Sequence, residues 1–160
     1  MKTPRSSRTG DSSVGIINSI SSNKNGSVII DSLIIHLEID GQSYRFLKDD
    51  GANINVISHS LRDKLSKYRK KKEKRLKVYF ANDTFTESSK FFDTVPCRFK
   101  DVKDYSGEVS FFANFQELPC PNGIDGILGM PWHQDLDVSV AYRKRNVTIP
   151  ARNLKFDTPF

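Results

Sequence analysis

Two short segments of this sequence place aspartate beside glycine next to apolar residues. Asp49, Asp50 and Gly51 follow an apolar run that ends at Leu47, and residues 124–129 read IDGILG. An aspartate carboxylate held at such a place is able to accept or donate a proton as a general base or acid. Taken alone, however, an Asp-Gly pair at the end of a strand is most often only a turn.

Metal chemistry is poorly supported by the other candidate residues. Cys97 and Cys120 lie far apart and form no C-x-x-C pair, and His36, His59 and His133 show no ligand spacing relative to them. The pattern favours two ordinary thiols. We therefore expect no metal site.

The composition indicates one domain with an unfolded portion. The chain has 160 residues, 37% of them hydrophobic, a formal net charge of +6 and a pI of about 9.3. A positive balance favours anionic partners and says nothing about the fold. The start has no apolar segment typical of a secretory signal, and no apolar run reaches the length needed to span a membrane. We expect a cytoplasmic protein without membrane contact.

The order of predicted elements favours a mostly β fold, specifically a small closed antiparallel β-barrel with one or two short helices. Asp40-Gly41 between two apolar runs predicts a β-hairpin, and Ser58 or Ser60 is placed to begin a short helix through Leu61 and Leu65. Further strands are expected over residues 76–80, 85–95, 97–99, 109–115, 138–140 and 145–149.

Three regions are expected along the chain. Residues 1–26, rich in Ser, Asn, Gly and basic side chains, are interpreted as a flexible leader. Residues 27–150 form the folded domain, and residues 151–160 form a C-terminal tail that is a candidate strand at a dimer interface.

The two Asp-Gly segments together resemble the signatures of the retropepsin-like aspartic proteases of gypsy-type LTR retrotransposons. FLKDDGANINVIS (residues 46–58) is similar to the family's active-site loop, and IDGILGMPWHQD (residues 124–135) is similar to its second signature. KVYFANDTFTES (residues 77–88) lies where the family carries its flap, although the glycine common at the tip is absent. Two motifs in the family's order are far more specific than either alone.

The resemblance implies a role for each motif residue. Asp49 would be the catalytic residue of a homodimer in which the two copies share one proton. The pair would activate water to cleave a peptide bond of a Gag-Pol polyprotein, with no metal or organic cofactor. Asp125 lacks the catalytic context and is interpreted as a turn residue. The supporting roles fall to Asp50, Gly51 and Ala52 in the active-site loop, to Ile127, Leu128 and Gly129 beneath it, and to Ala81, Asn82, Asp83 and Thr84 in the flap.

The sequence departs from this family at two positions. Asp50 replaces a Ser or Thr whose hydroxyl locks the two loops together, and an ionised carboxylate only accepts hydrogen bonds. Lys48 replaces an apolar residue, and because positions 48 and 50 lie on one side of an extended strand, Lys48 is placed to neutralise Asp50. The alternative is a decayed or domesticated, protease-shaped interaction domain.

Residues 62–77 carry ten of the 25 Lys and Arg residues. They fit either a solvated loop, which we favour, or a contact with nucleic acid, for example inside virus-like particles.

Overall fold

The computed structural model describes residues 14–17, 33–72, 74–80, 83–100, 102, 109–150 and 153–158. β-strands are the main secondary structure among these residues. They are accompanied by the short α-helices α2 (His59–Arg62) and α3 (Met130–Leu136) and by a 3-10 turn, η1 (Ser66–Tyr68). Among the described residues, no helix is long and apolar enough to cross a membrane.

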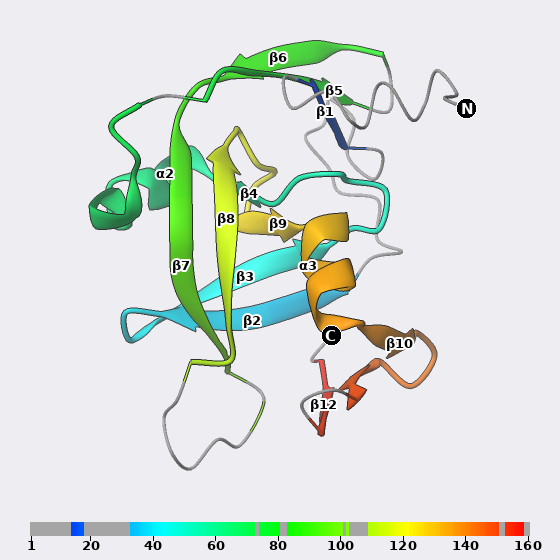
Figure 1. The fold of residues 1–160 in the computed structure, drawn as a ribbon. Coiled ribbons are helices and arrows are strands. Elements are labelled where there is room, and N and C mark those ends of the chain that lie inside the picture. Colours follow the sequence, from blue (N-terminus) through cyan, green and yellow to red (C-terminus); the bar gives the residue numbers. More distant parts are fainter. Residues whose placement is uncertain are drawn as a thin grey trace.

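A closed barrel forms the centre of the fold, as the sequence predicts (Figure 1). Most neighbouring strands are antiparallel as expected, but the barrel is not wholly so, because β3 and β9 pair in parallel, as do β4 and β8. The barrel order is β2 (Ile34–Ile39), β3 (Gln42–Lys48), β9 (Gly126–Leu128), β4 (Val56–Ile57), β8 (Phe111–Glu117) and β7 (Phe91–Phe99).

The β2–β3 hairpin confirms the turn expected at Asp40-Gly41. Ile39 pairs with Gln42, and both turn residues have positive φ, 52° at Asp40 and 82° at Gly41. That conformation matches the twist of the flanking strands and is cheap for glycine. The buried residues of β2 alternate along the strand, so its apolar side chains enter the barrel core.

Two three-stranded sheets flank the barrel. One consists of β1 (Val14–Ile17), β5 (Leu76–Phe80) and β6 (Phe85–Ser88), and the other of β10 (Ser139–Ala141), β11 (Asn146–Ile149) and β12 (Leu154–Asp157). At residues 14–17 the expected leader is therefore a strand paired with β5. The remaining leader residues lie outside the described part, and the role of the tail at a dimer interface stays a prediction.

The single return strand expected over residues 85–95 is wrong. The structure divides it into β6, which pairs with β5, and β7, which enters the barrel. Within β7 the register shifts between Phe92 and Val95, and Thr94 has a φ of 54°. A pattern of apolar residues does not show that consecutive strands belong to different sheets.

The helix expected after Ser58 is shorter than the sequence suggests. Ser58 is its N-cap residue, but its hydroxyl hydrogen-bonds to that of Ser60 at 2.8 Å and not to the helix backbone. Helix α2 ends at Arg62, and Leu65 precedes the separate turn η1. Leu61 and Leu65 are both buried, so the apolar spacing is satisfied without a continuous helix.

Candidate active site

Asp49 lies where β3 gives way to a tight turn. The residue is only 2% exposed, and the backbone N–H of Gly51 donates to Asp49 Oδ1 at 2.8 Å. The N–H of Ala52 donates to the carbonyl of Asp49 at 3.2 Å. These bonds fix both the backbone and the carboxylate, and they supply part of the hydrogen bonding that a buried carboxylate requires.

The second motif lies directly against this loop. Lys48 pairs with Leu128 in the parallel β3–β9 ladder, and the N–H of Asp49 donates to the carbonyl of Leu128 at 2.9 Å. Ile127 and Leu128 are 1% and 0% exposed. The structure thus brings together the two motifs that the sequence singled out and places β9 beneath the loop.

Gly129 allows the two backbones to approach closely. A Cβ atom there would lie 2.2 Å from the carbonyl oxygen of Ile54 and 2.7 Å from that of Ala52. The N–H of Gly129 donates to Asn55 Oδ1 at 2.9 Å. Asn55 is buried, and the sequence analysis missed it because no pattern distinguishes it from the other polar residues after the loop.

Lys48 and Asp50 form the pair that strand geometry predicts. Lys48 Nζ donates to Asp50 Oδ1 and, at 2.9 Å, to the hydroxyl of Tyr142. The Lys48 side chain is 2% exposed and that of Asp50 is 63% exposed. Burial raises the pKa of Asp50, but the hydrogen bond and charge of Lys48 and the proximity of His133 outweigh it, so the pKa lies below its ordinary value.

His133 is a second residue that the sequence analysis did not assign to the loop. Its Nε2 lies 3.1 Å from Asp50 Oδ1, and its side chain is 10% exposed. Burial is the main reason that the pKa of His133 is lowered. His133 belongs to the quoted second motif, but only the fold shows that it faces the loop.

Asp125 has a structural role, consistent with its interpretation as a turn residue. Its carboxylate accepts a hydrogen bond from the backbone N–H of Arg45 at 2.8 Å, and its own N–H donates to the Arg45 carbonyl at 2.8 Å. The carboxylate therefore fastens the start of β9 to β3 and is not presented at a loop equivalent to that of Asp49.

The expected flap is a hairpin formed by β5 and β6. The N–H of Phe80 donates to the carbonyl of Thr84 at 2.8 Å, and the N–H of Asp83 donates to that of Phe80 at 3.1 Å. Asp83 has a φ of 65°. Ala81 and Asn82 lie outside the described residues, and a flap function for this hairpin stays a prediction.

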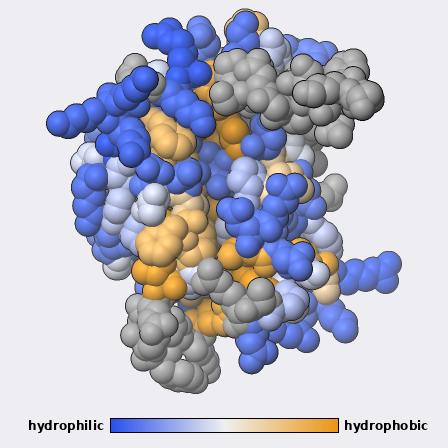
Figure 2. Space-filling model, viewed as in Figure 1, coloured by the Kyte–Doolittle hydropathy of each residue, from blue (hydrophilic) through white to orange (hydrophobic). Residues whose placement is uncertain are grey.

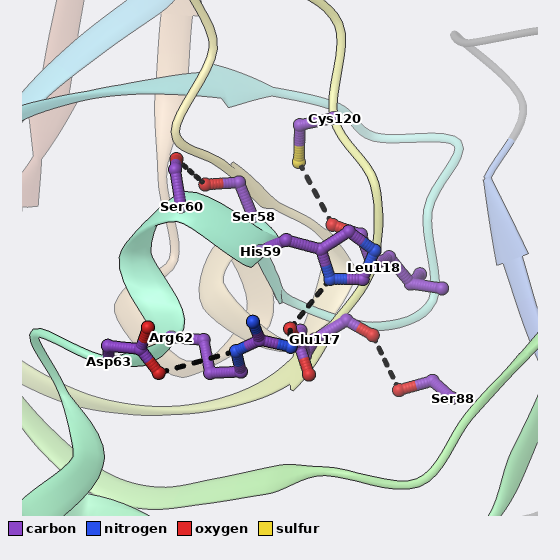
Figure 3. A network of polar contacts seen from close by, with 9 residues as sticks. All are labelled: Ser58, His59, Ser60, Arg62, Asp63, Ser88, Glu117, Leu118 and Cys120. Atoms are coloured by element: carbon purple, nitrogen blue, oxygen red, sulfur yellow. Dashed lines mark hydrogen bonds and ion pairs between the residues drawn. The ribbon is translucent and has the colours of Figure 1, made fainter.

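A buried carboxylate anchors the helix that follows the active-site loop (Figure 3). Glu117 Oε2 lies 2.6 Å from His59 Nδ1 and 3.1 Å from an Arg62 guanidinium nitrogen, and its side chain is 4% exposed. The Glu117 carbonyl accepts a hydrogen bond from the Ser88 hydroxyl at 2.6 Å. This network joins α2 to β8 and β6, and its members are too far apart in sequence for a motif to reveal them.

The basic stretch forms an exposed surface from α2 to β5. Two lysines make ion pairs, Lys67 with Asp40 at 3.4 Å and Lys70 with Asp93 at 3.2 Å. Lys74 and Lys77 lie over the rings of Phe91 and Phe85, as do Lys64 and Lys67 over Tyr44 and Tyr68. These contacts fit a solvated surface, and nucleic-acid binding stays a prediction.

Both cysteines are free thiols. Burial raises the pKa of Cys97 far above its ordinary value and, with a contribution from Asp125, raises that of Cys120 to about 12. Thiols with such pKa values are poor nucleophiles. A group of three or more His, Cys, Asp or Glu residues able to hold a metal is not found within the described ranges.

A cavity of about 340 Å³ lies beside the active-site loop, between β7, β8 and α3. Its lining includes Asn53, Ile54, Phe112 and Trp132 but not Asp49. Hydrophobic side chains gather over β7 and β8 on the face seen in Figure 2, and Phe112 is 59% exposed. Asp49 therefore does not open into this cavity.

A family model described as "Aspartyl protease" matches residues 35–132, which is more than half of the chain and includes all of the first motif and residues 124–132 of the second. The chain belongs to this aspartyl protease family. The matched range includes Asp49 and the loop around it. A comparison with curated proteins found no match.

The aspartyl protease fold is also found among solved structures. The retroviral protease-like domain of Ddi1 from Leishmania major is similar to this chain, with a TM-score of 0.58 and 11% sequence identity. The match covers 82% of this chain and 98% of the Ddi1 chain. At this identity the similarity establishes the fold alone, which is that of a retroviral protease-like domain.

Proposed function

We propose that this aspartyl protease domain is a homodimeric endopeptidase in which each subunit supplies Asp49. The observation that carries the proposal is the loop itself, where a buried carboxylate is fixed by Gly51 at the end of β3 and supported by Leu128. A carboxylate at such a rigid position is oriented before the substrate arrives.

Two copies of the loop are needed for the reaction. Carboxylates held close together cannot both ionise, so the pair of Asp49 side chains would share one proton. The ionised member accepts a proton from a bound water, which attacks the scissile carbonyl carbon, while the protonated member donates its proton to the carbonyl oxygen. The resulting tetrahedral intermediate collapses as a proton passes to the leaving amine.

The dimer is proposed because one chain supplies one such loop within its described residues. Asp125, the other aspartate of the paired motifs, is engaged with Arg45 on β3. Asp50, adjacent to Asp49, has a side chain that is 63% exposed, which leaves this side of the loop open to a second subunit. A two-fold axis beside the loop would bring the two carboxylates together.

The substrate class that fits best is a polyprotein of a gypsy-type LTR retrotransposon, cleaved at apolar sites. This proposal is supported by the order of the two motifs, residues 46–58 and 124–135, and by the pattern of residue types in each. Such a substrate places the enzyme in the cytoplasm or within virus-like particles.

A second candidate is a catalytically impaired or domesticated dimerisation domain. Lys48 and Asp50 favour it, because the charged pair replaces an apolar residue and a hydroxyl in the active-site loop. The two charges offset each other and the Lys48 side chain is buried, so the pair is compatible with a rigid loop in either case.

Cleavage of a library of apolar peptides, with and without a statine inhibitor that mimics the transition state, separates the two candidates. A peptidase cleaves a subset of the library and is inhibited by statine. A protein that binds statine without cleaving any peptide would support the impaired alternative.

A further inference from the structure

Asp50 lies where two basic side chains from different elements meet. Lys48 Nζ, at the end of β3, donates to Asp50 Oδ1, and His133 Nε2, on α3, lies 3.1 Å from the same oxygen. Lys48 Nζ also donates to the hydroxyl of Tyr142, which lies just after β10. Side chains from β3 and α3 thus converge on the residue next to Asp49, and Tyr142 from the β10–β11 turn holds the Lys48 side chain.

The hydrogen bonding of His133 fixes its tautomer. Its Nδ1 lies 2.8 Å from the carbonyl oxygen of Gly129, and a carbonyl only accepts, so Nδ1 carries a hydrogen. In the neutral ring, Nε2 then has a lone pair facing a carboxylate oxygen. This nitrogen is buried, lies within ion-pair distance of Asp50 and makes no aligned hydrogen bond. A favourable contact therefore requires one additional proton.

The charges around His133 set the pH at which that proton binds. Burial lowers the pKa, the bond to Gly129 raises it, Lys48 on β3 lowers it, and Asp50 and Asp49 in the loop raise it. The net result is a pKa below the ordinary value of 6.5. His133 is thus neutral near pH 7 and gains the additional proton only as the pH falls through this lowered pKa.

We propose that His133 is a positioning residue for the active-site loop, which on binding a proton at Nε2 completes an ion cluster with Asp50 and Lys48. Lys48 neutralises Asp50 at every pH at which both are charged, and His133 adds a second contact to the carboxylate on acidification. Because Gly51 follows Asp50 and donates to Asp49 Oδ1, fixing Asp50 also restricts the catalytic carboxylate. The inference rests on the proposed function only in taking this loop to be the catalytic one.

Imidazole NMR of the full chain tests the cluster without any activity. His36, His59 and His133 are the three histidines of the sequence. The imidazole signal that disappears in His133→Gln is that of His133. The pKa of His133 should fall in Asp50→Asn, which removes an anion from an exposed position, and rise in Lys48→Leu, which removes a cation. The signal of His59, which pairs with Glu117 away from this cluster, is the internal control. A His133 pKa unchanged in both variants overturns the cluster.

The amide signal of Gly51 tests the positioning role. In the parent it should show a titration step at the pKa of His133, and in His133→Gln that step should vanish, since glutamine donates an N–H without titrating. A step that persists in His133→Gln belongs to another group and overturns the role. If the enzyme is active, the change in kcat/KM that occurs around the pKa of His133 should be absent from the pH profile of His133→Gln. A parent that cleaves no peptide while the cluster titrates as described would reject the peptidase proposal and leave the ion cluster intact.

Discussion

The N–H of Asp49 donates to the carbonyl of Leu128 across 2.9 Å. This bond extends the parallel β3–β9 ladder into the active-site loop. It fixes Asp49 and Leu128 relative to each other although they lie far apart in the sequence. The position of the carboxylate therefore depends on the β9 segment as much as on its own loop.

Gly129→Ala should destabilise the domain strongly, because its Cβ would lie 2.2 Å from the Ile54 carbonyl oxygen. We expect the free energy of unfolding to fall by about 3 kcal/mol or more, measured by urea denaturation. Gly41→Ala is the matched control. It meets no atom within 4 Å and has a φ of 82°, so it should cost only about 1 kcal/mol. Equal losses in the two variants would refute the close-packing explanation.

Activity per subunit should decrease on dilution, because a single Asp49 lacks its partner. Peptide cleavage measured across a dilution series should fall in parallel with the dimer fraction seen by sedimentation. Retention of full specific activity by a sedimenting monomer would instead require both catalytic carboxylates to come from one chain.

Lys48 and Asp50 should be energetically coupled in dimer formation. In Lys48→Leu, two Asp50 carboxylates that no longer pair with a lysine would approach at the dimer axis. Lys48→Leu combined with Asp50→Ser restores the family pattern and should recover affinity. A double-mutant cycle on the dimer dissociation constant should give a coupling of about 0.5–3 kcal/mol. Strictly additive effects would show that the pair is not a substitute for the hydroxyl clamp.

Acidification should weaken the Lys48–Asp50 contribution to folding in the parent chain, whereas it should strengthen dimerisation of the Lys48→Leu variant. In the parent chain, Lys48 holds the pKa of Asp50 below its ordinary value, so the pair's contribution to folding is present above the unfolded pKa of about 3.9. That contribution is lost as the pH falls through the lowered pKa. In Lys48→Leu, Asp50 must gain a proton to assemble, so dimerisation should strengthen as the pH falls. Association that is independent of pH in this variant would contradict the explanation.

Glu117→Gln should weaken the attachment of α2 to the barrel. The buried carboxylate faces both His59 and Arg62, and its loss should lower the free energy of unfolding by about 1–3 kcal/mol. Glu87→Gln, at an exposed position of β6, is the control and should change stability by less than about 0.5 kcal/mol. Equal stability of the two variants would show that the network contributes little.

The sequence predicted those parts of the fold that local patterns determine. Alternating apolar residues and Asp40-Gly41 specify the β2–β3 hairpin, and the two motifs locate Asp49 and β9. The division of residues 85–99 between two sheets was missed, because pairing partners are distant in sequence. Asn55, Glu117 and Tyr142 were missed for the same reason, since each acts through a contact that only the folded chain creates.

The central claim is that Asp49 is the catalytic carboxylate, and the comparison of Asp49→Asn with Asp125→Asn tests it most directly. Asparagine removes the titrating group with little change in shape, and at position 125 its side-chain oxygen is still able to accept from the N–H of Arg45. Both variants should fold and dimerise. Peptide cleavage should fall to the uncatalysed background in Asp49→Asn and remain within a few-fold of the parent in Asp125→Asn. An active Asp49→Asn beside an inactive Asp125→Asn would contradict the assignment.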